Sequence, residues 1–552
     1  MKSTVIIDDS ISVTIPEKYG VVYTPSALAD FVSHLLVRCS KLCHVKLSKI
    51  LDPACGEGAL LSAVHARVSE VRLMGIDIDK AIKKSLPCFD DSEIEDFIIP
   101  RSSYSSTSSC YWKKKCSGID AIIANPPWSS DRVYSKTLLH KKGFTLAIGQ
   151  YDSYELFIEL GVSVLREGGI FAFIIPDSLF APEKMCLRKW LLENTELKIV
   201  ARLGEKIFPE VFRATTVIVG RKAVPKTTDK TVCYRLDTTS RNAFLMNKLD
   251  LYTHFLRNKH SVLQNRFLNN PLCNIDVDTT MADMAITQKM SIGNPKIGDF
   301  FVFGRGVEIS KNGIVVTCQK CGVTQGIRRR VQDGGYFECK SCHEKQPLGQ
   351  GVVTQIVKRH PRNGLVMMWV GESVGRYRLS NPRFVMLGID GIDYKTNTLF
   401  VGPKLLVRKT GLGIYAAVDT TGTLTNQTVY ILKLKGEDSS EGLYYYLAFL
   451  NSRVMYYFYQ KMFGAAEWKS HPYLTKQVLF SLPVPKYNKK SSLDCSIVAI
   501  SKKLSLSNQR DEDLELESLI AKKYGINRRQ MERIKDLMSS LPELSSINDM
   551  RF

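Results

Sequence analysis

In the first 220 positions, short continuous apolar runs alternate with segments in which apolar residues are three or four positions apart. This pattern constrains the fold more than any other feature. Short apolar runs are typical of buried strands, and apolar residues spaced three or four positions apart are typical of helices. Strands that alternate with helices predict a mostly parallel, doubly wound α/β sheet. We expect strands at 47–52, 71–77, 119–124, 170–176, 197–203 and 215–220. A helix is expected directly after "YTPS", with Thr24 as its N-cap and Pro25 in its first turn.

The rest of the chain changes character, and 552 residues exceed the size of one ordinary domain. We predict an α/β domain over 1–222 and a partly helical connector over 223–290. Short strands and turns rich in glycine and aromatic residues predict a mixed, strand-rich domain over 291–490. Charged residues with helical periodicity predict a helical C-terminal segment over 491–552.

The chain is strongly basic. Seventy-six Lys and Arg oppose fifty-five Asp and Glu, which gives a net charge of +21. Such a chain usually binds a polyanion, most often nucleic acid. No apolar run approaches the ~20 residues of a membrane span, and the N-terminus does not resemble a signal peptide. Fourteen cysteines without dense spacing suit a reducing compartment, so we expect a cytoplasmic protein without a membrane partner.

The stretch "LDPACGEGALL" (51–61) joins an expected strand to an expected helix through a glycine turn. Gly56 and Gly58 let a ligand approach the backbone closely. Asp77 ends the next expected strand, where a carboxylate is placed to accept hydrogen bonds from ribose hydroxyls. The pattern is not G-x-G-x-x-G, so it favours a nucleoside ligand other than NAD. An ordinary glycine turn in an α/β domain is the alternative.

The stretch "IIANPPWSS" (122–130) ends an expected strand on a rigid corner. Pro126 and Pro127 fix two φ angles, which would hold the Pro126 carbonyl beside the Asn125 side-chain carbonyl. Trp128 adds a flat face, so the corner suits a planar group that carries an exocyclic amine. Two acceptors on the N–H bonds localise the nitrogen lone pair, which can then attack an electrophilic methyl group. Positioning and electrostatics would carry most of the acceleration.

Several motifs resemble those of the gamma, TaqI-like class of adenine-N6 DNA methyltransferases. "NPPW" resembles their motif IV, "DPACGEG" their motif I and "YGVVYTPSALADFV" (19–32) their motif X, in the order of that class. "GPKLLVRKTG", "YYLAFLNSRVMYYFY" and "YLTKQVLFSLPVP" are similar to the specificity domain of the same group. The resemblance implies a Rossmann-like methyltransferase domain, a target-recognition domain, S-adenosylmethionine as cofactor and double-stranded DNA as partner.

The resemblance also implies roles for the matched residues. Asn125 and Pro126 would accept from adenine N6, with Pro127 stiffening the corner and Trp128 stacking on a base flipped out of the duplex. Asn125 would also border the cofactor. The remaining cofactor contacts would be Tyr23, Thr24, Pro25, Asp52, Ala54, Cys55, Gly56, Gly58 and Asp77.

The chain departs from this family at motif III, where an aspartate usually contacts the adenine of the cofactor. The expected strand there is "EDFIIPRSSYSS", with Ser102 or Ser103 in the expected place and Asp96 too early. A second aromatic residue against the flipped base has no assigned position.

Four cysteines in the second domain have the spacing of a zinc ribbon, which we expect over 316–345. "CQKC" and "CKSC" are two C-x2-C pairs separated by seventeen residues, a spacing typical of structural Zn²⁺ sites. Arg328, Arg329 and Arg330 between the pairs are candidate phosphate or groove contacts, with a solvated charge run as the alternative. The predicted ligands are Cys318, Cys321, Cys339 and Cys342.

The sequence therefore predicts a site-specific DNA adenine-N6 methyltransferase of restriction-modification or phage defence, with a separate restriction or defence component as a further expected partner. Cytosine N4, RNA and protein glutamine are alternative methyl acceptors, because their amines and amides pose the same chemical problem. A DNA-binding module that has lost catalysis is the non-enzymatic alternative.

Overall fold

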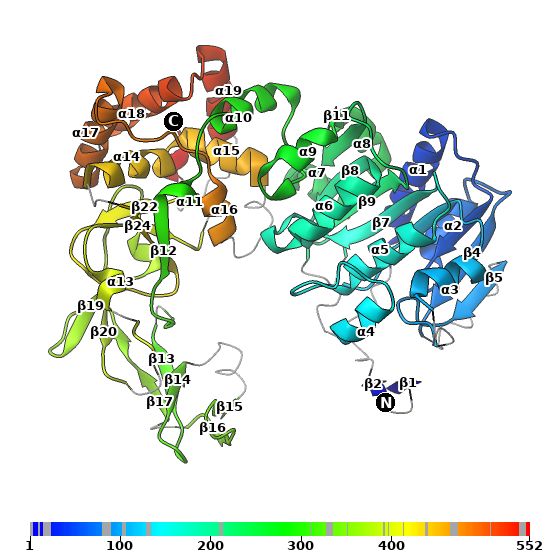
Figure 1. Ribbon diagram of the computed structural model, residues 1–552, viewed down its shortest axis with the longest axis horizontal. Coiled ribbons are helices and arrows are strands. Elements are labelled where there is room, and N and C mark those ends of the chain that lie inside the picture. Colours follow the sequence, from blue (N-terminus) through cyan, green and yellow to red (C-terminus); the bar gives the residue numbers. More distant parts are fainter. Residues whose placement is uncertain are drawn as a thin grey trace. The chain divides into compact units, whose positions relative to one another are not determined.

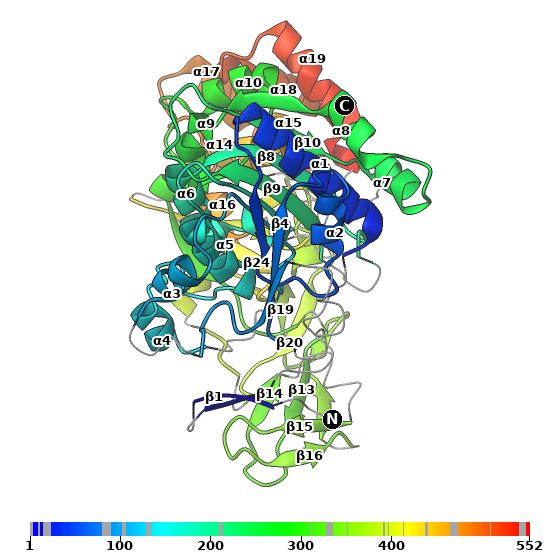
Figure 2. The ribbon, with the colours of Figure 1, turned by 90° about the vertical axis from the view of Figure 1, so that its right-hand side faces the viewer.

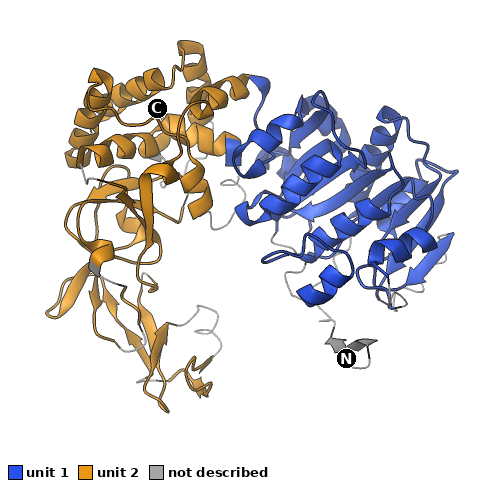
Figure 3. Ribbon diagram, in the orientation of Figure 1, with its two compact units in different colours: residues 1–281, 462–464 blue, residues 282–461, 465–552 orange. Residues whose placement is uncertain are grey.

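The computed structural model divides the chain into two compact units (Figure 3). The first comprises Met1–Met281 with Met462–Gly464, and the second comprises Ala282–Lys461 with Ala465–Phe552. The four-part division expected from composition stays a prediction. The structure describes residues 4–8, 11–14, 24–79, 90–101, 106–128, 134–208, 213–310, 312–326, 335–349, 352–389, 392–395, 397–411, 413–436, 440–463, 473–507, 509–539 and 548–552.

A nine-stranded sheet forms the centre of the first unit (Figure 1). In spatial order its strands are β11 (His260–Leu263), β10 (Lys230–Arg235), β8 (Glu196–Gly204), β9 (Thr215–Arg221), β7 (Ile170–Pro176), β6 (Ala121–Ala124), β3 (Lys49–Asp52), β4 (Arg72–Asp77) and β5 (Asp91–Ile94). The five strands from β7 to β5 are parallel, and β9 runs antiparallel between β7 and β8. The predicted doubly wound α/β sheet is confirmed. A short hairpin of β1 (Thr4–Asp8) and β2 (Ile11–Thr14) precedes it.

Helices cover both faces of this sheet (Figure 2). One face carries α1 (Ser26–Leu42), α2 (Ala59–His65), α7 (Thr238–Leu245) and α8 (Leu251–Asn258). The other carries α3 (Ser108–Lys115), α5 (Ser153–Val164) and α6 (Met185–Asn194), and α4 (Lys136–Lys141) follows β6 on the chain. Alternate residues of β7 enter the two cores, with Phe171 and Phe173 on one side and Ala172 and Ile174 on the other. This period of two explains why the strand is apolar throughout.

Two local expectations at the edges of elements were wrong. Thr24 is not the cap of α1, because Pro25 occupies that position and the helix begins at Ser26. The Thr24 hydroxyl instead accepts a hydrogen bond from a residue 101 positions away, Asn125. The strand expected at "EDFIIPRSSYSS" also lies earlier, because β5 ends at Ile94.

The second unit is strand-rich and ends in helices, as predicted. One four-stranded sheet contains β12 (Phe301–Arg305), β24 (Val429–Leu434), β21 (Lys404–Arg408) and β22 (Ala416–Asp419). Another contains β18 (Val357–Lys358), β20 (Arg383–Met386), β19 (Leu365–Trp369) and β23 (Leu424–Thr425). The smaller sheets are β14 (Thr324–Gly326) with β13 (Ile314–Thr317) and β17 (Val353–Gln355), and β15 (Tyr336–Glu338) with β16 (Lys345–Pro347).

The helices of this unit are α10 (Met281–Ser291), α11 (Ile297–Phe300), α13 (Asn397–Phe400), α14 (Ser440–Asn451), α15 (Arg453–Phe463), α16 (Lys476–Ser481), α17 (Ser492–Leu506), α18 (Arg510–Lys523) and α19 (Arg528–Ser539). Buried ion pairs hold α18 in place. Glu517, 1% exposed, lies 3.1 Å from the Arg376 guanidinium and 3.3 Å from that of Arg453. In the part of the chain that the structure describes, no helix has the length and apolar character to cross a membrane.

Candidate active site

The predicted site residues meet where the winding of the sheet reverses. From β3 the chain adds β4 and β5 on one side, and it then returns to add β6 and β7 on the other. The carboxyl ends of β3 and β6 are neighbours, because Leu51 pairs with Ile122 in a parallel register. Asp52 ends β3, and Asn125 directly follows β6. Open α/β sheets bind their ligands at such a switch point.

The glycine turn after β3 has the backbone conformation that its sequence predicts. Gly56 has φ of +50° and Gly58 has φ of +81°, where a side chain would be strained. A Cβ atom built on Gly56 would meet no atom within 4 Å, so the turn has open space above it. Gly58 is also the N-cap of α2. The turn therefore presents backbone to an open region at the carboxyl edge.

Two carboxylates hold this turn. The Gly56 N–H donates to Asp77 Oδ2 over 2.9 Å, and the Ala54 N–H donates to Asp52 Oδ1 over 3.0 Å. Burial raises the pKa of Asp52 to about 8, and it also raises the pKa of Asp77. Cys55 is buried in the core beside α1, and burial raises the pKa of its thiol. Asp77 is half-buried, which leaves its carboxylate partly accessible to a ligand.

The corner after β6 is held by several separate segments. Asn125 Nδ2 donates to Thr24 Oγ1 over 3.2 Å, which directs the nitrogen side of the amide toward the start of α1. The Ser153 hydroxyl donates to the Pro127 carbonyl over 2.5 Å, and the Arg213 guanidinium donates to the Trp128 carbonyl. Among the residues that the structure describes, the Pro126 carbonyl accepts no hydrogen bond.

Phe208 is a site residue that sequence reasoning missed. Its ring lies edge-to-face against Trp128, with centroids 5.3 Å apart and planes at 85°. Trp128 Nε1 also donates to the Ile174 carbonyl over 3.4 Å. Trp128 is half-buried, whereas Phe208 is buried. Phe208 lies in "LGEKIFPEVFRATTVIVGRK", a stretch similar to the end of the catalytic domain of the TaqI-like class, but the sequence alone did not single it out as the partner of Trp128.

Asp96 lies just beyond the carboxyl end of β5, next to β4 and Asp77. Its Oδ1 accepts from the Ile98 and Ile99 N–H groups, and its Oδ2 accepts from the Tyr134 hydroxyl over 2.7 Å. Burial raises the pKa of Asp96 to about 6. Because β5 ends at Ile94, Asp96 stands two positions after the strand and not within it, while the residue that contacts the cofactor adenine stays a prediction. The rival positions Ser102 and Ser103, like Tyr23 of the cofactor set, lie outside the described residues.

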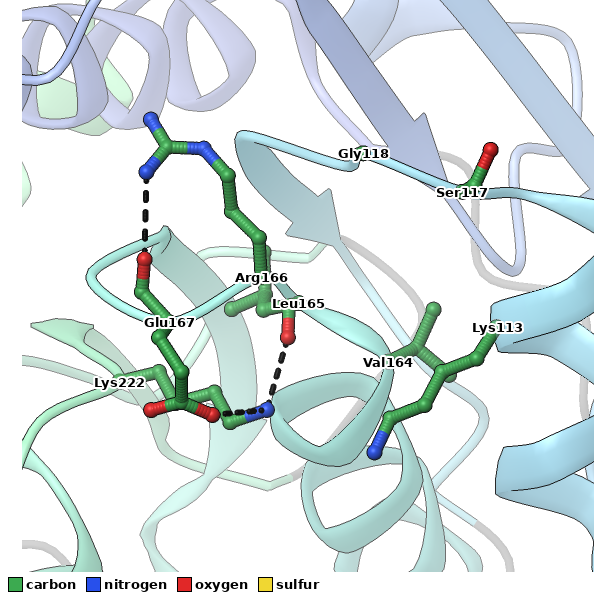
Figure 4. A pocket seen from close by; sticks show the side chains of 8 residues that line it. All are labelled: Lys113, Ser117, Gly118, Val164, Leu165, Arg166, Glu167 and Lys222. Carbon is green, nitrogen blue, oxygen red and sulfur yellow. Dashed lines mark hydrogen bonds and ion pairs between the residues drawn. The ribbon is translucent and has the colours of Figure 1, made fainter.

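A pocket of about 260 Å³ lies at the opposite edge of the sheet (Figure 4). Its lining includes Lys113, Arg166 and Lys222, from segments at the amino ends of β6 and β7 and the end of β9. The Lys222 ammonium is already bound to the Leu165 carbonyl and to the Glu167 carboxylate. This pocket contains none of the predicted site residues.

The four ribbon cysteines converge in the second unit. All four sulfur atoms lie within 4.8 Å of one another. Cys318 Sγ lies 3.6 Å from Cys342 Sγ, and Cys321 Sγ lies 3.5 Å from Cys339 Sγ. Four thiolates about 2.3 Å from one tetrahedral ion are about 3.8 Å apart. The donor set and its spacing therefore fit Zn²⁺.

The same unit carries an excess of positive charge. Residues 309–389 contain thirteen Lys and Arg but only four Asp and Glu. The loop from β18 to β19 exposes Arg359, His360 and Arg362, and the nearest acids along the chain are Glu344 and Glu372. The basic run Arg328–Arg330 lies outside the described residues.

Two families match parts of the chain. The Eco57I restriction-modification methylase matches residues 67–208, and the TaqI-like C-terminal specificity domain matches residues 366–484. These matches confirm the resemblance proposed from the motifs. The four cysteines lie outside both matched ranges.

Named relatives and a solved structure agree with these matches. Type II methyltransferase M.TthHB8I of Thermus thermophilus is 28% identical over 200 residues, which are 34% of this chain and 42% of that protein. Type II methyltransferase M.BsuBI of Bacillus subtilis is 31% identical over 199 residues, 32% of this chain and 38% of that protein. The chain thus matches about two fifths of the length of each.

The Type ISP restriction-modification enzyme LlaGI, solved as a nuclease-deletion mutant with a DNA substrate mimic, shares the fold. That likeness has a TM-score of 0.51 and 14% identity, and it covers 88% of this chain and 47% of that chain.

Proposed function

We propose that this chain, which joins an Eco57I-type restriction-modification methylase domain to a TaqI-like specificity domain, is a DNA methyltransferase. It transfers a methyl group from S-adenosylmethionine to the N6 amine of an adenine. One observation carries the proposal most directly. The Pro126 carbonyl and the Asn125 amide lie at the switch point of the sheet, one strand away from an open glycine turn.

The residues around that turn fit the cofactor. Open space above Gly56 admits a ligand against the backbone, and the partly accessible Asp77 carboxylate is an acceptor for ribose hydroxyls. Asp52, Ala54, Cys55 and Gly58 complete the turn, and Tyr23, Thr24 and Pro25 would contact the methionine part. We add Asp96 as the candidate for the adenine part, in place of Ser102 or Ser103. When bound, S-adenosylmethionine supplies an electrophilic methyl group.

The corner would then hold the methyl acceptor. Asn125 Oδ1 and the Pro126 carbonyl accept the two N–H bonds of an exocyclic amine, which keeps the lone pair on nitrogen. Trp128 offers the stacking surface, with Phe208 fixing its ring from the side. Because the amine of a paired base lies inside the duplex, the target base must be flipped out. These groups act by position and charge, and no general base is needed before transfer.

The second unit would recognise the DNA. Zn²⁺ bound by Cys318, Cys321, Cys339 and Cys342 would be structural and not catalytic, because four protein thiolates leave no open coordination position. Its role would be to stabilise the ribbon. The basic character of residues 309–389 suits contacts to DNA phosphates. The family that matches residues 67–208 is described as a restriction-modification methylase, which supports a separate restriction or defence component as a proposed partner.

Expression in a methylation-free bacterial host, followed by modification-sensitive sequencing of its DNA, tests the proposal. We expect methylated adenine at a defined site, and none in cells that express Asn125→Ala. Modified cytosine would instead identify the acceptor as N4. If the DNA stays unmodified and labelled methyl is transferred to RNA or protein, then RNA or protein is the substrate in place of DNA. Absence of both transfer and cofactor binding would favour the non-catalytic DNA-binding alternative.

A further inference from the structure

We infer that Ser153 and Arg213 are positioning residues for methyl transfer, and this inference rests on the proposed function. Each holds a carbonyl of the corner after β6, one at Pro127 and the other at Trp128. Together they fix the direction of the carbonyl that remains, that of Pro126.

The proline backbone explains why two tethers suffice. The rings of Pro126 and Pro127 fix φ near −65°, and each proline also restricts the residue before it to extended conformations. The ψ range that remains for Pro126 is about 40° wide, so its carbonyl could tilt while the rings stayed in place. Anchoring the carbonyls of Pro127 and Trp128 narrows this range and holds the Pro126 carbonyl in one direction.

Ser153 is itself held firmly. It is the first residue of α5, directly after the N-cap Asp152, whose N–H donates to Glu155 over 2.7 Å. The ammonium of Lys184, 5% exposed, pairs with both of these carboxylates. The helix start is thus anchored in the core. The hydrogen bond from the Ser153 hydroxyl to the Pro127 carbonyl therefore joins the corner to a fixed part of the protein.

Arg213 reaches the corner from another part of the sheet. It precedes β9, the antiparallel strand next to β7, and its guanidinium bonds to the Trp128 carbonyl. The Trp128 indole bonds to Ile174 of β7 at the same time. The backbone and the ring of Trp128 are therefore held from adjacent strands, which fixes the stacking surface relative to the Pro126 carbonyl.

The contrasting explanation is that these bonds only stabilise the fold. Measurements of reaction rate and of protein stability distinguish the positioning role from a purely structural role. A misdirected acceptor slows the chemical step while substrate binding persists. Placement errors of about 1 Å cost on the order of 100-fold in rate. We expect Ser153→Ala and Arg213→Met each to lower kcat at least about tenfold. The KM for DNA, the cofactor Kd and Tm should stay near wild-type values.

Two matched controls are available in the same elements. Ser163 of α5 donates to a helix carbonyl, that of Glu159, over 2.7 Å. Arg221, at the far end of β9, donates to the Gly168 carbonyl over 3.3 Å. Ser163→Ala and Arg221→Met remove similar bonds without touching the corner, so both should retain wild-type kcat. Ser153→Thr keeps a hydroxyl and should recover most of the rate.

The assay measures transfer of labelled methyl from S-adenosylmethionine to DNA that carries the site found by sequencing. Wild-type kcat in Ser153→Ala and Arg213→Met, with Asn125→Ala inactive, would overturn the positioning role alone. Equal losses in the control variants, or losses confined to Tm and DNA binding, would also overturn it. If the wild-type chain methylates no DNA, the proposed function itself fails.

Discussion

The Gly56 N–H donates to the Asp77 carboxylate over 2.9 Å, so a single hydrogen bond joins the turn after β3 to the end of β4. The second carboxylate oxygen of Asp77 accepts from the Asp79 N–H, also over 2.9 Å. The acid proposed to hold a ribose is thereby fixed in orientation by two backbone donors. Each of its oxygens retains capacity for a further donor, because a carboxylate can accept about four hydrogen bonds.

Replacing Asp77 by Asn should weaken cofactor binding. Charge-assisted hydrogen bonds contribute about 1.5–3 kcal/mol, so Asp77→Asn should lower S-adenosylmethionine affinity roughly 10- to 100-fold. Isothermal titration calorimetry on the full chain measures this. Asp91→Asn, on the neighbouring strand β5 and paired with Arg72, is the control and should bind normally. Unchanged affinity in Asp77→Asn would remove this residue from the cofactor site.

Asp52→Asn should change how stability depends on pH. Burial raises the pKa of Asp52 to about 8 in the folded state, whereas an unfolded Asp has a pKa near 4, so between these pH values the folded state binds more protons than the unfolded state. Its contribution to stability is therefore lost as pH rises. Asn has no such dependence and keeps the acceptor for the Ala54 N–H. The variant should gain stability relative to wild type by up to about 1.4 kcal/mol per pH unit between pH 5 and 8.

Thermal unfolding of both proteins from pH 5 to pH 9 tests this expectation. Glu70→Gln alters an exposed carboxylate on the same unit and should give a curve parallel to wild type. A parallel curve for Asp52→Asn as well would show that Asp52 is ionised in the folded protein.

Loss of one ribbon thiolate should release the metal. Cys321→Ser leaves three sulfur ligands, and zinc content measured by mass spectrometry should fall well below one ion per chain. DNA affinity should fall with it, while cofactor affinity should persist because that site lies in the other unit. Cys495→Ser, which changes an exposed cysteine of the same unit, is the control. Full zinc content in Cys321→Ser would contradict the proposed ligand set.

The exposed loop between β18 and β19 should contribute to DNA affinity through phosphate contacts. If Arg359 and Arg362 each neutralise one phosphate, the double change to Ser should reduce the slope of log Kd against log salt by about 2. Fluorescence anisotropy at several salt concentrations measures both slope and affinity. Changing Lys489 and Lys490, exposed elsewhere in this unit, should alter neither. Identical effects of the two double variants would show that only net charge matters.

Removing Glu517 should destabilise the second unit. The Arg376 and Arg453 guanidinium groups around it are 7% and 4% exposed, and Glu517→Ala leaves them short of one negative partner. Breaking a buried pair on one side costs about 3–5 kcal/mol. Denaturant unfolding should show this loss, whereas Glu515→Ala on the exposed face of α18 should show almost none. Equal stability of the two variants would mean that the ion pairs of Glu517 make no net contribution to the free energy of unfolding.

The sequence predicted those parts of the fold that depend on local pattern. Strands such as β7 can be recognised in the sequence because both of their faces are buried, which makes every residue apolar. The edge strand β5, "DSEI", carries no such signal, and the apolar run after it misled the prediction. Phe97, Ile98 and Ile99 are apolar because they enter the core as a turn around Asp96.

Long-range contacts at the site were beyond sequence reasoning. The four residues of the corner are local and rigid, so their motif was visible. The residues that hold it, Thr24, Ser153, Phe208 and Arg213, come from three distant parts of the chain, since Phe208 and Arg213 both lie between β8 and β9. No spacing rule connects them, because only the folding of the sheet brings them to one edge.

The path of the chain around Met462 has a consequence for genetic recombination. The second unit interrupts the first, since Met462 returns to it and its carbonyl accepts a hydrogen bond from Asn274. A single crossover near Met281 therefore delivers the whole second unit, together with residues 462–464 of the first. The helical tail must come from the same parent as residues 282–461, because Glu517 in the tail pairs with Arg376 and Arg453. A second crossover near Met462 would separate Glu517 from these arginines, so the second unit is expected to be inherited as one segment that begins near Met281.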